Sequence, residues 1–404
     1  MSSIHPEAEA TGHASADRVI RMVVLSDIHA TQAGDPITNV AESTAEHPKL
    51  NALTGAREFL EGVAGDADCI ICPGDLIHQG HTEPMGWVWK ELQDLAKTLG
   101  APLVATAGNH DMALEATGAE RPNSALRDLD PQFPFPDQSC VDTYWAHDFA
   151  IIASGSWRVL SINSSAQMSF FDESERDHGR LGRDCMRELP KRLDAIGTGK
   201  AINVCVCHHH PQEWTEDSDD ETSHMIEGDR LLKLLEERPE RWMLIHGHMH
   251  HPRLDYVGHG SGGTVRLASG SIGANLLAES GIQFRNQLHI VDFDMNAQEL
   301  GLLVAGEVQS FDWETGEGWT TPAPGSGLPV SEPFGYRRDG IELAVWLREQ
   351  AQQLGRRTWS WKEIIELEPR CKYLAEIDRR SFYQGVRRLK GGVVEAREEV
   401  TFEW

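Results

Sequence analysis

Five short apolar runs in this sequence each end in polar residues whose side chains can bind metal ions. The runs are RVIRMVVLSD (18–27), DCIICPGD (68–75), PLVATAGNHD (102–111), AINVCVCHHHP (201–211) and RWMLIHGHMH (241–250). Each has the length and apolar content of a buried strand. Open α/β sheets place their ligand sites at the carboxyl ends of strands. We therefore expect the polar ends of these five runs to form one site.

The order of the predicted elements indicates the class of fold. Helical patterns such as LTGAREFLEGVA and PMGWVWKELQDLAKTLG separate the first three runs, whereas later strands such as AIIASG, WRVLSINS and TVRLASGS follow one another closely. Alternating strands and helices followed by a strand-rich part predict an α/β fold, with two sheets packed face to face and helices outside.

Composition divides the chain into four parts. Residues 1–17 are polar and acidic, lack the features of a secretory signal, and are expected to be a disordered leader. Residues 18–312 form the large α/β domain. Five Gly and four Pro between residues 315 and 335 predict a linker over 313–335. Residues 336–404 then form a small α+β module of three helices and a hairpin, with Ser360 as a helix N-cap.

The charge and the cysteines exclude several classes of protein. A formal net charge of −26 argues against a protein that coats nucleic acid or an acidic membrane, although residues 331–404 carry +1 and the rest −27. The sequence has no run of 18 apolar residues, which a membrane-spanning helix would require, so no membrane partner is expected. Seven cysteines without disulfide-like spacing favour a reducing cytoplasm. Cys69 and Cys72 form a C-x-x-C inside an apolar strand, which favours packing over redox chemistry.

The strand ends combine carboxylates, an amide and imidazoles, and none of the cysteines falls among them. The candidate residues are Asp27, His29, Asp75, Asn109, His110, Asp111, His208, His209, His210, His248 and His250. This mixture suits manganese, iron, zinc or nickel better than a cysteine-rich structural zinc site or an all-oxygen calcium site. One carboxylate can bridge two such metals roughly 3.5–4 Å apart, a spacing that serves to activate water and clamp a phosphoryl group.

Taken in order, these blocks resemble those of the calcineurin-like metallophosphoesterase family. The matching blocks are D-x-H (Asp27, His29), G-D (Gly74, Asp75), G-N-H-D (Gly108 to Asp111), H-x-P (His209, Pro211) and G-H-x-H (Gly247 to His250). The resemblance covers roughly residues 18–306 and implies a four-layer αββα sandwich. It does not extend to the C-terminal part.

Carried over residue by residue, the resemblance implies two divalent metal ions, with manganese favoured over iron, zinc or nickel. The first ion would be held by Asp27, His29, Asp75 and His250, and the second by Asp75, Asn109, His209 and His248. A metal-bound hydroxide would attack phosphorus. His110 would stabilise the growing charge and protonate the leaving oxygen, and Asp111 would orient His110 by a hydrogen bond.

The histidine-rich strand ends leave alternatives open. The H-x-P spacing favours His209 as the ligand, with His208 or His210 as alternatives. Because successive side chains on a strand face opposite ways, His208 and His210 are expected to point together, away from the metals. His246 is expected to pack inside its strand, and His251 to face solvent or contact substrate.

Other polar features are expected to lie in solvated loops. The stretch EWTEDSDDE (213–221) has six acids in nine residues and is expected to be a solvated loop. The alternative is a lid near the site. Four loop histidines are each expected to be surface residues, namely His78, His81, His178 and His224.

The last predicted helix, DRRSFYQGVRRLK, is basic. Its cationic residues, which are candidates for nucleic-acid binding, are Arg379, Arg380, Arg387, Arg388 and Lys390. Three helices followed by a hairpin resemble a winged helix-turn-helix, which would place its third helix in the major groove of DNA. The alternative is a packing or oligomerisation module whose arginines pair with the acidic domain.

These features predict a metal-dependent phosphoesterase that hydrolyses phosphodiester bonds, with a nucleotide-type substrate. The alternative is a nuclease or nucleic-acid end-processing enzyme whose C-terminal module docks DNA or RNA. A non-catalytic scaffold is disfavoured because every expected ligand is present.

Overall fold

The computed structural model describes residues 19–113, 121–168, 177–197, 199, 202–212, 224–257, 263–275, 285–396 and 399–404. The predicted leader at residues 1–17 and the acidic stretch at 213–221 lie outside these residues.

The first large sheet carries three parallel strands at one side. Its order is β12 (Gly318–Thr320), β11 (Gly306–Glu314), β10 (Gln287–Asp294), β1 (Val19–Val24), β2 (Cys69–Cys72) and β3 (Leu103–Ala105), and β13 (Ser331–Phe334) also pairs with β11. Strands β1, β2 and β3 are parallel, while β10 runs antiparallel to β1. The carboxyl ends of β1, β2 and β3 therefore meet at one edge.

The second sheet is parallel through its centre. Its order is β4 (Phe149–Ser154), β5 (Trp157–Ile162), β6 (Ile202–Val206), β7 (Trp242–His246), β9 (Thr264–Ala268) and β8 (Arg253–Val257). Strands β5, β6, β7 and β9 are parallel, so their carboxyl ends also share one edge.

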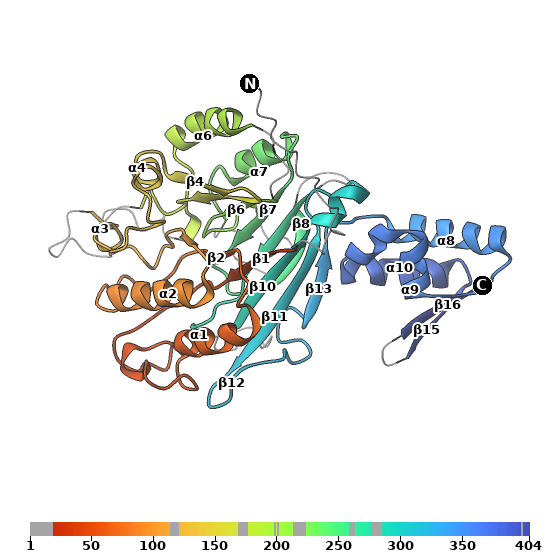
Figure 1. The fold of residues 1–404 in the computed structure, drawn as a ribbon, viewed down its shortest axis with the longest axis horizontal. Helices are drawn as coiled ribbons and strands as arrows, with labels where there is room; N and C mark the ends of the chain where they lie inside the picture. Colours follow the sequence, from red (N-terminus) through yellow and green to blue (C-terminus); the bar gives the residue numbers. More distant parts are fainter. Residues whose placement is uncertain are drawn as a thin grey trace, which may run out of the picture.

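Helices cover the outer faces of both sheets. Helices α1 (Ala52–Val63) and α2 (Met85–Leu99) flank the first sheet, and α6 (Arg183–Ile196) and α7 (Gly228–Glu236) flank the second (Figure 1). The shorter helices α3 (Ser124–Arg127) and α4 (Gln138–His147) lie between them in the chain. The αββα sandwich expected from the sequence is confirmed.

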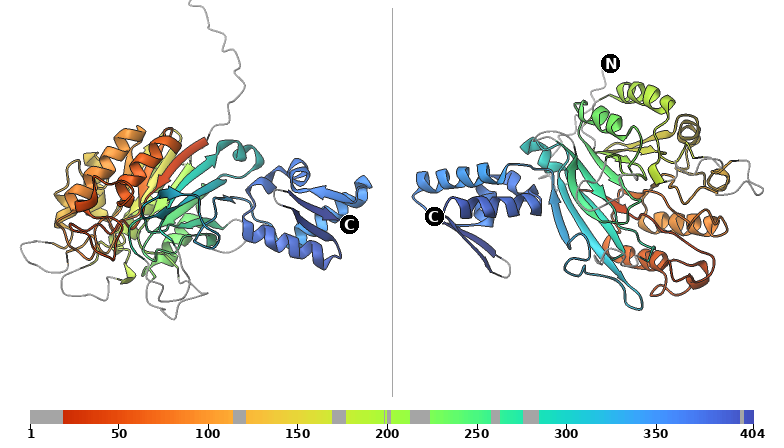
Figure 2. Two further views of the ribbon diagram at one scale, coloured as in Figure 1. Left: turned by 90° about the horizontal axis from the view of Figure 1, so that it is seen from below. Right: turned by 180° about the vertical axis from the view of Figure 1, so that it is seen from behind.

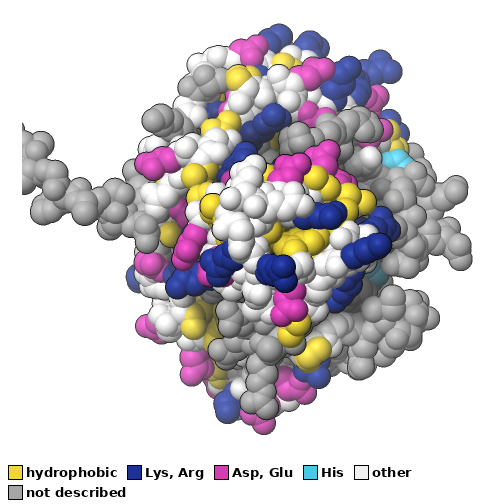
Figure 3. All heavy atoms as spheres, turned by 90° about the vertical axis from the view of Figure 1, so that its right-hand side faces the viewer, with side chains coloured by type: hydrophobic (Ala, Val, Ile, Leu, Met, Phe, Trp, Pro, Cys, Tyr) yellow, Lys and Arg dark blue, Asp and Glu magenta, His cyan; other side chains and the backbone are white. Residues whose placement is uncertain are grey.

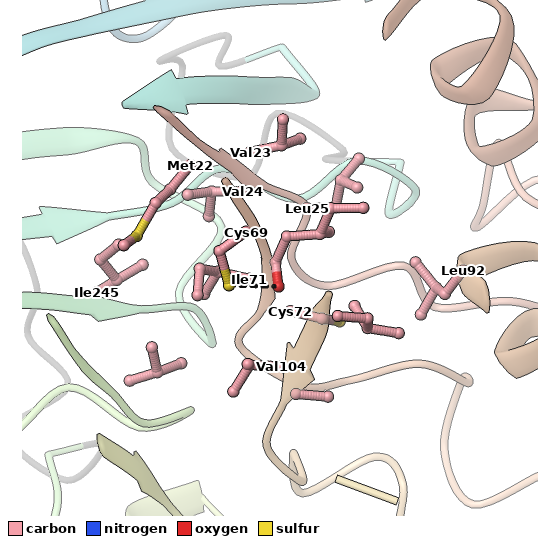
Figure 4. Packing of buried hydrophobic residues seen from close by; sticks show 14 of the residues in the cluster. Met22, Val23, Val24, Leu25, Cys69, Ile71, Cys72, Leu92, Val104 and Ile245 are labelled. Carbon is pink, nitrogen blue, oxygen red and sulfur yellow. Dashed lines mark hydrogen bonds between the residues drawn. The ribbon is translucent and has the colours of Figure 1, made fainter. Parts of the chain in front are cut away.

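Helix α2 shows why these segments fold as they do. Its buried residues recur at helical spacing, including Val88, Leu92 and Leu95, so one face packs against the sheet. Gly100 ends the helix in a left-handed conformation, with a φ of 64°. Between the sheets, residues such as Met22 and Ile245 belong to one buried cluster (Figure 4).

The stretch at residues 313–335 is not the simple linker that its composition predicted. It contributes β12 and β13, which both pair with β11 in the first sheet. Most of the Gly and Pro residues lie in the turns beside these short strands, although Gly318 begins β12 and Pro333 lies within β13. Gly327 (φ 148°) and Gly335 (φ 117°), for example, adopt backbone conformations that other residues rarely reach.

The C-terminal module has its own buried core. It comprises α8 (Gly340–Leu354), β14 (Thr358–Ser360), α9 (Trp361–Leu367), α10 (Glu376–Arg388), β15 (Gly392–Ala396) and β16 (Glu399–Glu403). Ser360 caps α9, as expected, in a reciprocal arrangement with Glu363. The three strands form a separate antiparallel sheet in the order β14-β16-β15. The sequence indicated the helices and the hairpin but not the short strand β14.

Candidate metal centre

The loops that follow neighbouring strands run side by side. After β1 and β2, the backbone N–H of Asp27 donates to the backbone carbonyl of Gly74 at 3.1 Å. The backbone N–H of His29 donates to the backbone carbonyl of Asp75 at 3.0 Å. After β6 and β7, the N–H of Gly247 donates to His208 at 3.1 Å. Backbone pairing thus continues past the strand ends and brings the polar blocks of both sheets to one place.

Strained backbone accompanies the candidate ligands. Five of them adopt a positive φ between 49° and 78°, which is uncommon for residues other than glycine, namely Asp27, His29, Asp75, His248 and His250. Such conformations persist only where the surrounding structure enforces them, and they cluster at functional sites. Gly108 and Gly247 make room here, because a Cβ on either would overlap the carboxylate of Asp75 or Asp27.

One cluster of side chains lies between the ends of β1, β2 and β7. The ligand atoms of Asp27, His29, Asp75 and His250 all lie within 4.8 Å of one another. Nε2 of His29 is 2.9 Å from Nε2 of His250 and 3.4 Å from Oδ2 of Asp75. Nε2 of His250 lies 3.3 Å from Oδ1 of Asp27. These are the four residues that the resemblance assigned to the first ion.

A second cluster adjoins the first beside Asp75. His208, His209 and His248 offer ring nitrogens within 4.8 Å of one another. Oδ1 of Asn109 lies 2.8 Å from Nε2 of His208 and 3.2 Å from Nδ1 of His248. Oδ2 of Asp75 lies 3.3 Å from Nε2 of His208, so Asp75 faces both clusters.

His208 does not point away from the centre, as strand alternation predicted. Its Nε2 faces Asp75 and Asn109, and its Nδ1 lies 3.0 Å from the carbonyl oxygen of Pro73. Nδ1 of His209 lies instead 2.8 Å from Oγ of Ser164. The alternation rule fails because β6 ends at Val206 and the chain beyond it turns.

No local signal in the sequence marks His208. The register of β6 and β7 pairs Val206 with Ile245, so it aligns His209, and not His208, with His248.

Burial and neighbouring charges set the ionisation of the centre. Burial raises the pKa of Asp27, but the hydrogen bond and charge of His250 outweigh burial and lower it to about 2. Burial likewise raises the pKa of Asp75, but neighbouring histidines, His208 foremost, bring it well below its usual value. Burial lowers the pKa of His248 to about 3. Two ionised carboxylates are thus held inside the protein beside the neutral imidazole of His248.

This donor set fits divalent metal ions. It consists of carboxylate and amide oxygens and imidazole nitrogens, and no cysteine belongs to the clusters among the described residues. Buried carboxylates need compensating positive charge, which a divalent cation supplies. Oxygen and nitrogen donors of this kind suit manganese, iron, zinc or nickel.

His110 stands beside the clusters, with its backbone tied to them. Its N–H donates to Oδ1 of Asp75 at 2.8 Å, and its ring centroid lies 4.6 Å from that of His29. The backbone N–H of Gln79 donates to Nδ1 of His110 at 3.0 Å. The neutral imidazole therefore carries its proton on Nε2.

Asp111 is buried and its carboxylate serves the backbone. It accepts hydrogen bonds from the N–H groups of Asp75, Leu76, Ile77 and Gly108, at distances from 2.6 to 3.2 Å. Both carboxylate oxygens are used in this way. Asp111 thus fixes the loop that carries Asp75, a role different from the expected hydrogen bond to His110.

His78 belongs to the site, although the sequence favoured a surface position. Its Nδ1 lies 3.4 Å from Nδ1 of His29, and its ring centroid is 5.3 Å from that of His110. No periodic signal marks this residue, because it lies in the loop beyond β2. Of the remaining histidines, His81 is exposed, and His246 is buried with its Nδ1 3.0 Å from the Gly247 carbonyl oxygen.

The basic residues of the C-terminal module lie outside this centre. Arg380, Arg387, Arg388 and Lys390 are exposed, and Arg379 is half-buried. All but Lys390 belong to α10.

The matched family model decides the family of the chain. Residues 20–252 match the model described as calcineurin-like phosphoesterase. The chain belongs to this family. The match covers the strand ends from β1 to β7 and therefore every candidate metal ligand. Membership and the Asp/His clusters together imply bound divalent metals, and the chain is a metal-dependent phosphoesterase.

Two comparisons with single proteins agree with this family. A protein of Moraxella catarrhalis (strain BBH18) named "Probable cyclic nucleotide phosphodiesterase" is 23% identical over 238 residues, which are 58% of this chain and 69% of that protein. A purple acid phosphatase from yellow lupin (Lupinus luteus) seeds is similar in fold, with a TM-score of 0.50 and 14% identity. That likeness covers 76% of this chain and 53% of the lupin protein.

None of the described helices is both long enough and apolar enough to cross a bilayer.

Proposed function

We propose that this phosphoesterase hydrolyses phosphodiesters of nucleotide type at a dinuclear metal centre. The observation that carries the proposal is the position of Asp75, whose Oδ2 lies 3.4 Å from Nε2 of His29 and 3.3 Å from Nε2 of His208. One carboxylate facing two adjoining clusters of donors is the arrangement that a bridged pair of ions requires.

The two donor sets divide the ligands between the ions. One ion would be held by Asp27, His29, Asp75 and His250, and the other by Asp75, Asn109, His208 and His248. His208 replaces His209 in this assignment, because Nε2 of His208 lies 3.3 Å from Oδ2 of Asp75 and 2.8 Å from Oδ1 of Asn109. When bound, two divalent ions supply an activated water and neutralise charge on the phosphoryl group.

His110 is proposed to stabilise the negative charge that develops on the substrate. Its Nδ1 accepts the Gln79 N–H, so the ring presents a proton on Nε2. That proton can be donated in a hydrogen bond to a phosphoryl or leaving oxygen. To transfer a proton completely, the His110 ring would first have to be protonated on both nitrogens. Nδ1 would then carry a proton and could no longer accept the hydrogen bond from Gln79. The geometry therefore favours hydrogen bonding over full proton transfer.

Asp111 and His78 are proposed as positioning residues. Asp111 holds the loop of Asp75 through four backbone N–H groups. Nδ1 of His78 faces Nδ1 of His29, so a proton shared between them would fix the orientation of the His29 ring.

The choice of a nucleotide-type diester rests on the Moraxella relative, whose name describes a probable cyclic nucleotide phosphodiesterase. The region that matches the family model, residues 20–252, includes the whole donor set. Hydrolysis of nucleic acid is the alternative, and the exposed arginines of α10 favour it.

Substrate comparison tests this proposal. The intact chain, loaded with Mn²⁺, would be assayed on bis(4-nitrophenyl) phosphate, 4-nitrophenyl phosphate, and 2′,3′- and 3′,5′-cyclic AMP. We expect metal-dependent hydrolysis of the diesters, with at least one cyclic nucleotide among the substrates. Faster hydrolysis of the monoester, or activity that persists after chelation of the metal, would reject the proposal.

A further inference from the structure

We infer that the outer face of α10 is a docking surface for double-stranded DNA. This inference concerns binding by the C-terminal module, so it goes beyond the proposed chemistry and does not depend on it.

The topology of the module gives the first reason. Its elements follow the order α8, β14, α9, α10, β15, β16, and the sheet order is β14-β16-β15. This is the arrangement of a winged helix-turn-helix, in which the third helix, here α10, enters the major groove. Helix α10 packs closely on α8, with Phe382 and Val386 buried in the core of the module.

The opposite face of α10 is exposed and, apart from Ile377, polar. Ile377 is 66% exposed, and Arg380, Ser381, Gln384 and Arg387 are also exposed at positions that recur at helical spacing. Helix α10 runs along one side of the module, and no described helix or strand crosses its outer face (Figure 2). The outer face of α10 is therefore accessible to a binding partner.

Charge favours a polyanion as that partner. A groove between α10 and β16 is lined by Arg379, Arg380, Tyr383, Gln384, Arg387 and Val400. The one acid in this lining is Glu376, which already pairs with Arg380. On this end of the molecule Lys and Arg side chains surround a hydrophobic patch, with acidic side chains among them (Figure 3). Residues 331–404 carry a net charge of +1, whereas residues 1–330 carry −27. Phosphate groups are therefore attracted locally while the acidic domain repels them elsewhere.

Size and side-chain chemistry favour duplex DNA over other polyanions. Helix α10 has 13 residues and so is about 20 Å long. A helix about 10–12 Å across fits the major groove of B-DNA but not the deep, narrow major groove of duplex RNA. Arg380 and Gln384 are side chains that read guanine and adenine edges, while Arg387 and Arg388 at the end of the helix suit phosphate contacts.

The module is also held firmly against the phosphoesterase domain. The N–H of Glu376 donates to Glu332 at 2.6 Å, and Lys372 and the hydroxyl of Tyr373 donate to Asp294 at 2.8 and 2.7 Å. DNA bound to α10 would therefore keep a defined position relative to the catalytic domain.

Fluorescence anisotropy tests this inference on the full chain. The probe is a labelled 20-base-pair DNA duplex of mixed sequence, and the background variant His110→Ala prevents cleavage during the titration. The test variant carries Arg387→Gln and Arg388→Gln. The control carries Lys191→Gln and Arg192→Gln, an equally exposed basic pair on α6 that makes the same change in charge. Thermal unfolding midpoints establish that both variants are folded.

We expect the α10 variant to bind the duplex about tenfold or more weakly, and the control to bind like the parent. The slope of log Kd against log salt should fall by about two, one for each lost phosphate contact. Equal binding by the two variants would overturn the inference. Tighter binding of single-stranded DNA or duplex RNA than of duplex DNA would overturn it as well. Hydrolysis of small diesters plays no part in this readout, so failure here leaves the proposed function untouched.

Discussion

Nε2 of His208 lies 3.3 Å from Oδ2 of Asp75, the carboxylate that faces both halves of the candidate metal centre. His209, one residue further, directs its Nδ1 to Ser164. Burial lowers the pKa of His208, but the adjacent Asp75 outweighs burial and raises it to about 9. This contact supports the proposal that His208, rather than His209, completes the second ion site.

The two histidines should therefore differ in their effect on metal content. His208→Ala removes a proposed ligand, so we expect it to release one of two bound Mn²⁺ ions per chain. His209→Ala removes a contact with Ser164 and should retain both ions. Equilibrium dialysis followed by elemental analysis measures the difference. Loss of an ion from the His209 variant, with two ions kept by the His208 variant, would reverse the assignment.

Removal of His110 should affect turnover but not metal content. His110→Ala deletes the Nε2–H donor, and we expect the turnover number to fall by about 10²- to 10⁴-fold. Both ions should remain, because His110 is not a proposed ligand. Steady-state kinetics on a diester with a poor leaving group provide the test, and unchanged turnover would exclude His110 from the reaction.

Asp111 should contribute to stability through the loop of Asp75. Asp111→Ala leaves four buried backbone N–H groups without their acceptor, and we expect the free energy of unfolding to fall by about 2–4 kcal/mol. Asp111→Asn keeps one acceptor oxygen, so its free energy of unfolding should fall by less. Chemical denaturation of the metal-free chain measures both losses. If the two variants were as stable as the parent, the carboxylate would not hold this loop.

His78 should influence metal affinity without binding metal. His78→Ala removes the ring that faces Nδ1 of His29, and outer partners of this kind typically change metal affinity by about 10- to 100-fold. His81→Ala is the matched control, since His81 lies on the same loop but is exposed. Competition with a fluorescent chelator measures both affinities. Equal affinities in the two variants would show that His78 does not position His29.

The sequence predicted the αββα fold and the strand-end blocks because parallel strands bring their carboxyl ends to a common edge. Asp27, His29, Asp75 and His250 follow predicted strands, and the structure brings their ligand atoms within 4.8 Å of one another. Strand order predicted that the strand ends form one site, and the resemblance to the metallophosphoesterases implied that these four residues share one ion.

Other features depend on contacts between segments far apart in the chain. The direction of His208 is set by a turn beyond β6, where strand alternation no longer applies. The role of Asp111 depends on backbone N–H groups about 35 residues away. Strands β12 and β13 pair with successive parts of the edge of β11 that β10 leaves free. Local patterns contain no information about such partners.

The most direct test of the account is the metal content of the intact chain and of Asp75→Ala after equilibration with Mn²⁺. Asp75 faces both clusters, so we predict two ions per chain in the parent and none in the variant. Circular dichroism would establish that the variant remains folded. One ion per parent chain, or two ions retained by the folded Asp75→Ala variant, would contradict a dinuclear centre bridged by this carboxylate.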